Sequence, residues 1–324
     1  MNKKKSYKIL GIFTTVIFIV MISCYIGAAL IIKDANGSII DMFKNFHGIY
    51  FNINDEYTNP EFTYSDSSLG SLSSTINQPL DNVNSVNIKT FSPDVKVNVG
   101  NTNEITVKLI TKSNDIKLDK VVSNNELTVY VKAKKSIAHF NLPDCKVEVT
   151  LPANYKKSFN VDGKSADISI TGIEFSDLNL HSVSGKINTT DTTAETLKLS
   201  TISGEIECSD ATAKDLNLST VSGDIKSSGK YNKLYSKSVS GEIKLQLSKD
   251  INDATVNTTS GDIKIQTSGD FGAKLDLSTT SGEIKNGLAV KNITSSNRKF
   301  TGESSDGSDR IIKAHTISGE IKID

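Results

Sequence analysis

The sequence predicts an all-β protein, a parallel β-solenoid with rungs of about 19 residues, preceded by one N-terminal transmembrane helix. Three observations predict this fold. A short motif, Ser-Gly followed by a charged residue and Ile, recurs at Ser184, Ser203, Ser222, Ser240, Ser260, Ser281 and Ser318. Apolar and polar residues alternate before each copy, as they do in a strand with one buried face. Near the N-terminus, 24 successive residues carry no charge.

The uncharged segment, residues 9–32, is long enough to cross the ~30 Å hydrocarbon core as a helix. Four lysines lie within residues 1–8, so the positive-inside rule places these residues in the cytoplasm and the rest of the chain outside. The expected location is therefore the cell membrane, with a single pass. Two processed alternatives remain open: cleavage of a signal peptide at Gly27-Ala28-Ala29, and lipidation at Cys24 in a loose lipobox.

Residues 33–80 are predicted to be a juxtamembrane segment and linker. The part through Asn54 has enough apolar residues for local order against the bilayer or a partner. Residues 57–79 are rich in Ser, Thr and Asn and poor in aliphatic side chains, which predicts a flexible linker. The single histidine of this segment, His47, is expected to be solvated.

Residues 81–324 are predicted to form an extracytoplasmic solenoid, because one repeat cannot bury its own apolar side. Each copy has an Ile three residues after the motif Ser and an apolar residue six before it: Leu178, Leu197, Leu216, Leu234, Ala254, Leu275 and Ile312. Parallel stacking at ~4.8 Å superposes identical positions, so the Ile residues form one internal ladder and the Leu residues another. An antiparallel meander, in which each motif is a hairpin turn, is the alternative.

Two eroded copies, Ser92-Pro93-Asp94-Val95 and Ser165-Ala166-Asp167-Ile168, extend the repeat toward residue 81. The 73 residues that separate them are close to four periods, which predicts about a dozen rungs and a rod of ~60 Å. The motif Gly is expected to turn the backbone through positive φ. Cys208 is predicted to be a small buried residue, and no disulfide with Cys145 or Cys24 is expected.

The resemblance to a known family rests on four segments. These are Val147–Pro152, the ladder of Ser-Gly-Asp/Glu-Ile motifs, the Gly-rich insert Thr301–Asp309 and the ending Thr316–Ile321. Together they resemble the bacterial "putative adhesin" family, a domain of unknown function, over about residues 80–324. The sequence departs from the family pattern at Ala166 and in the region 110–140. The resemblance implies a right-handed parallel β-helix at the surface of a Gram-positive cell, and some members are accessory to cell-envelope stress systems.

The charge balance gives no electrostatic case for binding of nucleic acid, since 37 basic residues cancel 37 acidic ones.

A β-helix polysaccharide lyase would need carboxylates outside the repeat that bind calcium, and an Arg or Lys base in a groove. Here the carboxylates belong to the repeat, at Glu205, Asp224, Glu242, Asp262, Glu283 and Glu320. Lysines follow them two positions later, at Lys226, Lys244, Lys264, Lys285 and Lys322. We interpret both columns as a soluble outer face, with weak binding of cations or a wall polymer as the alternative.

No catalytic residue, cofactor or metal ligand is predicted. His181 and His315 occupy equivalent positions in the first and last strict repeats, ~34 Å apart by rung spacing, so they cannot form one site. An enzyme would have to be tested at His139, Arg298 or Arg310.

The sequence therefore favours a non-enzymatic cell-surface binding or structural module. An accessory protein of an envelope-stress system is the alternative, and a carbohydrate-active enzyme comes last. Expected partners are the membrane, through residues 9–32, and a protein or wall polymer on the solenoid face or at the C-terminal edge. At that edge, residues 318–324 are predicted to form the terminal rung, partly covered by the insert 301–309.

Overall fold

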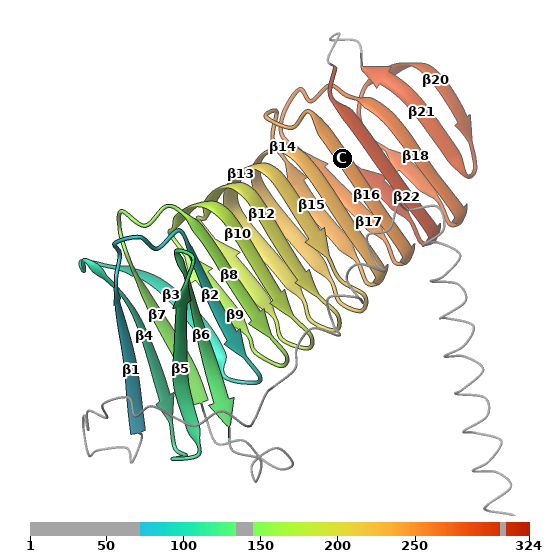
Figure 1. The fold of residues 1–324 in the computed structure, drawn as a ribbon. Helices are drawn as coiled ribbons and strands as arrows, with labels where there is room; N and C mark the ends of the chain where they lie inside the picture. The colour runs from blue at the N-terminus through green and yellow to red at the C-terminus, as the bar shows by residue number, and fades with distance from the viewer. Residues whose placement is uncertain (1–71, 134–144, 305–308) are drawn as a thin grey trace, which may run out of the picture. The chain divides into compact units, whose positions relative to one another are not determined.

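A computed structural model describes residues 72–133, 145–304 and 309–324, all of which belong to one compact unit, Thr58–Asp324. These residues form β-strands joined by turns, without a helix (Figure 1). The predicted span at residues 9–32, and with it most of the segment 33–80, lies outside the described residues. Within the described ranges, no helix has the length and apolar character needed to cross a bilayer.

The strands, in chain order, are β1 (Leu72–Pro79), β2 (Ser85–Thr90), β3 (Asp94–Gly100), β4 (Glu104–Thr111), β5 (Ile116–Ser123), β6 (Glu126–Ala133), β7 (Cys145–Pro152), β8 (Ser158–Gly163), β9 (Ile168–Thr171), β10 (Glu174–Ser182), β11 (Ile187–Thr190), β12 (Thr193–Thr201), β13 (Ile206–Ser219), β14 (Ile225–Ser240), β15 (Ile243–Leu247), β16 (Asp253–Ser260), β17 (Ile263–Thr267), β18 (Lys274–Ser281), β19 (Ile284–Asn286), β20 (Val290–Ser296), β21 (Lys299–Ser304), β22 (Ile311–Ser318) and β23 (Ile321–Ile323).

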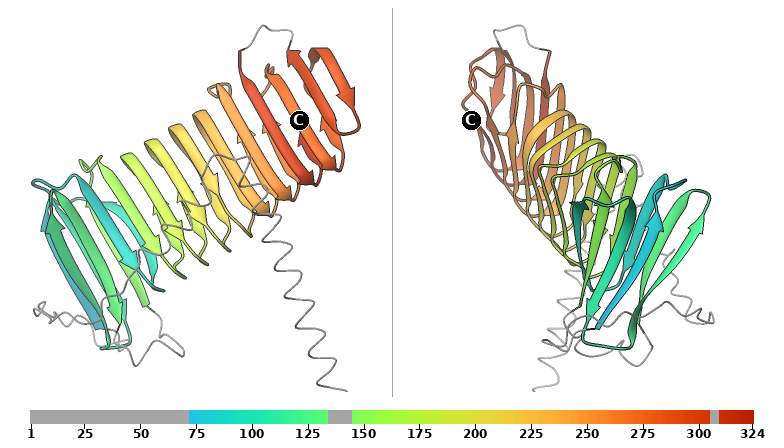
Figure 2. Two further views of the ribbon diagram at one scale, coloured as in Figure 1. Left: turned by 45° about the vertical axis from the view of Figure 1, so that its right-hand side comes forward. Right: turned by 90° about the vertical axis from the view of Figure 1, so that its left-hand side faces the viewer.

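The middle of the unit is a stack of parallel strands in two faces, and each circuit of the chain adds one level (Figure 2). In the Leu face, β8, β10, β12, β13, β14 and β16 pair in that order. In the Ile face, β9, β11, β13, β14, β15 and β17 do the same, and the motif isoleucines lie directly opposite one another. Parallel, in-register stacking is therefore confirmed, and the antiparallel meander is wrong.

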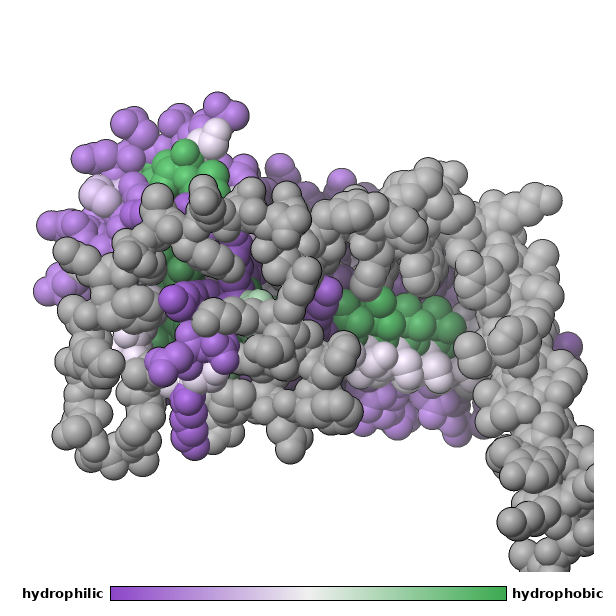
Figure 3. Space-filling model, turned by 60° about the horizontal axis from the view of Figure 1, so that its bottom comes forward, coloured by the Kyte–Doolittle hydropathy of each residue, from purple (hydrophilic) through white to green (hydrophobic). Residues whose placement is uncertain are grey.

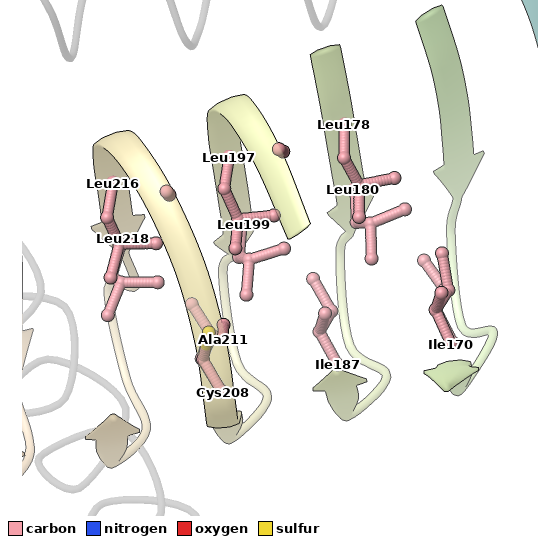
Figure 4. Close-up of a cluster of buried hydrophobic side chains, with 14 of the residues drawn as sticks. Ile170, Leu178, Leu180, Ile187, Leu197, Leu199, Cys208, Ala211, Leu216 and Leu218 are labelled. Atoms are coloured by element: carbon pink, nitrogen blue, oxygen red, sulfur yellow. The ribbon is translucent and has the colours of Figure 1, made fainter. Parts of the chain in front are cut away.

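The core lies between the two faces. Paired leucines from three successive levels, such as Leu197 and Leu199, lie above Ile187 and Cys208 of the Ile face (Figure 4). These four side chains are fully buried, which confirms both predicted ladders. Burial of Cys208 as a free thiol is confirmed too, and Cys145 is also free.

Each motif forms the corner between the faces, and its Gly is required by close approach of successive backbones. A Cβ on Gly204 would lie 2.0 Å from the carbonyl oxygen of Gly185, and one on Gly223 would lie 2.1 Å from that of Gly204. Only two of the seven motif glycines, Gly241 and Gly319, have a positive φ. The predicted role in turning the backbone is therefore wrong for most copies.

The recurrent hydroxyl two residues before the motif Ser ties most corners to a neighbouring level, Thr258 being an exception. The Thr201 hydroxyl donates to the Gly185 carbonyl at 3.4 Å and accepts the Gly204 N–H at 3.0 Å. Ser182, Thr220, Thr279 and Thr316 likewise donate to a corner carbonyl of the adjacent level. The hydroxyl recurs because it satisfies buried backbone groups that the strands leave unpaired.

The first rungs depart from the prediction. Strands β2 and β3 lie between β6/β7 and β8/β9, so the two eroded motif copies are on adjacent levels. The 73 residues between them do not form four rungs. Strands β6 and β7 form one level beyond β2 and β3, and β8 belongs to the level on the other side. Strands β4 and β5 leave the stack and pair antiparallel with β7 and β6. The end of the predicted linker is also ordered, since β1 pairs with β4.

The other end is interlaced in the same way. Strands β22 and β23 lie between β16/β17 and β18/β19. The prediction that residues 318–324 form an exposed terminal rung is therefore wrong. The insert folds back over the end of the stack, but it does so as the antiparallel hairpin β20–β21, which pairs with β18.

Candidate functional site

A continuous strip of repeated side chains follows the motif corners along the stack, and we call it the corner strip. Its first column holds the residues before each motif Ser, which in the middle levels are the half-buried Val183, Ile202, Val221 and Val239. Its second column is the motif Ser itself, exposed in all seven copies. Figure 3 shows such a row of hydrophobic side chains, bordered first by neutral and then by hydrophilic residues.

The acidic column next to the serines has two structural roles, set by side-chain length. The shorter Asp carboxylates accept a backbone N–H from the next level: Asp94 from Asp167 at 3.0 Å, Asp167 from Lys186 at 2.7 Å, Asp224 from Glu242 at 2.9 Å and Asp262 from Glu320 at 2.8 Å. These carboxylates hold the levels together at the corners.

The longer Glu side chains instead bridge levels through lysines. Glu205 contacts Lys226 at 2.6 Å and Lys186 at 3.3 Å, and Glu242 contacts both Lys244 and Lys264 at 2.6 Å. Hydrogen bonding from Lys226 is the main cause that lowers the pKa of Glu205. For Glu242, burial raises the pKa, but hydrogen bonds from its two lysines outweigh that effect and lower it.

The negative charges of the acidic column are compensated by the lysines beside it, which pair with Glu205, Glu242 and Glu320. The motif serine hydroxyls make no hydrogen bond to the described residues and face solvent beside aliphatic side chains. In the described ranges, no group of three or more His, Cys, Asp or Glu residues could hold a metal ion. What the strip offers is a line of hydroxyls at strand spacing, ~4.8 Å, with an apolar border.

Comparison with known proteins agrees with this architecture. The sequence model of a family described as Toastrack DUF4097 matches residues 83–324. The chain belongs to the Toastrack DUF4097 family. No curated protein is similar to the chain at a significant level.

Solved structures of bacterial proteins are similar to the chain at low sequence identity. One, described as a putative adhesin from Bacteroides fragilis, is 15% identical, with a TM-score of 0.50 over 78% of this chain and 97% of its own. A putative lipid binding protein from Parabacteroides distasonis is 19% identical, with a TM-score of 0.47 over 78% and 96%. A putative adhesin from Parabacteroides merdae is 13% identical, with a TM-score of 0.36 over 78% and 96%.

The histidines of this Toastrack domain lie on separate levels. His181 contacts the Ser200 hydroxyl at 3.0 Å, and His315 contacts that of Ser278 at 2.9 Å. Because β22 is inserted into the stack, five strand spacings separate the two histidines, about 24 Å rather than the predicted ~34 Å. They still do not form one site.

Of the other residues named for an enzyme, the structure describes Arg310 and Arg298. The Arg310 guanidinium donates to the carbonyls of Lys249 and Gly272 and stacks over Phe271, so it holds turns together. Arg298 lies in the turn between β20 and β21. His139 and His47 lie outside the described residues.

The sequence analysis did not identify two features, a buried lysine and a surface hollow. Lys237, in β14, is 8% exposed, and burial lowers the pKa of its ammonium group. A hollow of about 440 Å³ near the start of the Toastrack domain is lined by Asp81, Asn103, Asn154, Tyr155 and Lys157, among others. The Lys157 ammonium group donates hydrogen bonds to the Val83 carbonyl and to the Asn84 side chain, so it stabilises the fold around the hollow. Neither feature recurs with the repeat, which is why the alignment of copies could not show it.

Proposed function

We propose that this protein is a non-enzymatic binding or structural module, held at the outer side of the cell membrane by residues 9–32. The observation that carries the proposal is the corner strip. It repeats an exposed serine hydroxyl at seven levels, and an apolar side chain precedes the serine at five of them: Val183, Ile202, Val221, Val239 and Ile317. A surface of this kind fits an extended, uncharged partner, such as a wall polymer or a peptide, that can contact several levels at once.

Two finer points belong to the same proposal. The right-handed winding and the Gram-positive surface follow from the family resemblance stated above. A role as accessory protein in envelope stress would require a membrane partner that carries the signal into the cell. Loss of a stress response on deletion, with binding to the surface intact, would favour that second role.

The binding test uses two matched pairs of substitutions. Ser203→Glu with Ser222→Glu places two carboxylates on the corner strip, on adjacent levels. Thr193→Glu with Thr212→Glu, also exposed and on adjacent levels, places them away from the motif corner. We expect the intact protein to co-sediment with purified cell walls. The Ser203→Glu/Ser222→Glu variant should lose this binding, whereas the Thr193→Glu/Thr212→Glu variant should keep it. Equal binding by both variants would overturn the corner strip as the binding surface.

The topology test adds protease to intact, wall-stripped cells. Because the lysines of residues 1–8 precede the span, we expect digestion of everything beyond residue 34 and protection of a membrane fragment only. A protected soluble domain would contradict the proposed orientation.

A further inference from the structure

The last strand pair of the described chain occupies an inner level of the stack. On one side, β22 pairs with β16 from Asp253↔Ile311 to Ser260↔Ser318. On the other side, it pairs with β18 from Lys274↔Ile311 to Ser281↔Ser318. In the Ile face, β23 lies in the same way between β17 and β19. The segment 309–324 is therefore a wedge between two levels that precede it in sequence.

The level beyond the wedge depends on it. Among the described strands, β18 pairs only with β21 and β22, and β19 pairs only with β23. Thus residues 274–304 join the rest of the stack through the wedge and through their own chain connection. If the wedge left, the edges of β16 and β17 would lose their hydrogen-bonding partners on that side.

Both sides of the wedge are held by backbone and corner contacts. Gly261 N–H donates to the Ser318 carbonyl at 2.9 Å, and Gly319 N–H donates to that of Ser281 at 3.1 Å. A Cβ at Gly319 would lie 2.0 Å from the Gly261 carbonyl oxygen, so a strand without Gly at this place would not fit. Ile312, Ile321 and Ile323 of the wedge are fully buried and continue the inner ladders. A strand pair that occupies this level must therefore have a Gly at the corner and apolar residues at the buried positions, as residues 309–324 do.

We propose that the wedge is exchangeable, and that the level between β16/β17 and β18/β19 accepts residues 309–324 of a second copy of this chain. Every contact described above is non-covalent and is made by the segment itself. The same residues from a second copy would make the same pairs, so the exchanged and unexchanged forms differ only at the connection between β21 and β22. We choose a second copy as the occupant because its residues 309–324 contain Gly319 and the buried apolar side chains in the required register. This inference is independent of the corner strip.

The test uses two differently tagged full-length copies, each with one added cysteine, in a background with Cys24→Ser and Cys145→Ser. One copy carries Thr255→Cys and the other carries Lys313→Cys, positions that are directly paired across β16 and β22. An interchain disulfide above the level of random collision requires that the wedge of one copy lies in the stack of the other. The control pair, Asn179→Cys and Lys198→Cys, is exposed and lies at an inner level that β22 does not occupy.

We expect a disulfide-linked heterodimer for the Thr255/Lys313 pair, increasing with protein concentration by mass action, and none for the control pair. A single chain with both cysteines of the test pair must form the internal disulfide, which shows that the geometry permits the bond. If that bond forms and the heterodimer stays at the level of the control pair, the wedge does not exchange. A disulfide to a third protein instead would overturn the second copy as the occupant.

Discussion

The carboxylate of Asp94 accepts the backbone N–H of Asp167 at 3.0 Å, although 73 residues separate the two in the chain. This is the same contact that Asp224 makes to Glu242 on the next level, 18 residues away. The corner geometry is thus preserved even though the intervening chain forms a different level, β6 and β7, and the antiparallel strands β4 and β5 before it returns. Contacts within a corner, rather than the spacing of copies along the sequence, define a level.

Replacing Ile225 by Ala should destabilise the protein by about 2–5 kcal/mol, because the side chain is fully buried between two other motif isoleucines. Lys226→Ala is the adjacent control. It removes an exposed ion pair to Glu205 and should change the free energy of unfolding by no more than about 0.5 kcal/mol. Chemical denaturation measures both, and equal midpoints would mean that the inner and outer sides are assigned wrongly.

Gly204→Ala should be far more harmful than Gly172→Ala. The added Cβ at position 204 would overlap the Gly185 carbonyl oxygen of the adjacent level, whereas at position 172 nothing lies within 4 Å. Gly172 has φ of 68°, so its substitution should cost about 1 kcal/mol through the backbone alone. For Gly204 we expect about 3 kcal/mol, because two levels must separate. A comparable thermal midpoint for the two variants would refute the close-approach explanation.

Thr201→Val tests the corner hydroxyl. The variant keeps the shape of the side chain but leaves the Gly204 N–H without its acceptor, so it should lose about 1–3 kcal/mol. Thr201→Ser keeps the hydroxyl and loses only a methyl group, and it should therefore be less destabilised than the Val variant. The reverse order in urea denaturation would show that packing, and not the hydrogen bond, selects the residue.

The ion pairs of the corner strip should weaken in acid. The folded-state pKa of Glu205 is lowered below 4.5, chiefly by hydrogen bonding from Lys226, so its contribution is present above that pH and is lost as the pH falls through the folded pKa. Glu205→Gln should thus be slightly less stable than wild type at pH 7, and the gap should close toward pH 3. The control is Glu195→Gln, at an exposed carboxylate that makes no ion pair with the described residues. Thermal midpoints with the same gap at both pH values would contradict this sign.

The middle levels could be predicted from the sequence because each level repeats the same residues at the same places. Ile206 and Ile225, for example, had to be equivalent, and only parallel stacking makes them neighbours. The reason for the Gly could not be predicted, since a sequence shows which residue lacks a Cβ but not which backbone approaches it. The exposed Ser of each motif was seen but given no role, because its solvent exposure becomes evident only once Gly204 and Thr201 are placed.

The ends could not be predicted for a different reason. The motif at Ser318 is as well formed as that at Ser260, so nothing in its own residues indicates that it lies between two earlier levels. The signal available was the long gap before it and the long gap after Asp94, each of which marks a segment that leaves the stack and returns. A gap in the repeat period shows where in the sequence the chain leaves the stack, but not which level of the stack it occupies when it returns.

The interlacing at both ends has a consequence for how such a protein can change in length during evolution. A repeat added next to β2/β3 or β22/β23 in the sequence would have to enter a level already flanked on both sides. A repeat duplicated among β9 to β17 meets no such obstacle, because there the order along the chain and the order in space coincide. Longer and shorter relatives should therefore differ by whole units of 18 to 21 residues in the middle of the domain, with the two interlaced ends kept unchanged.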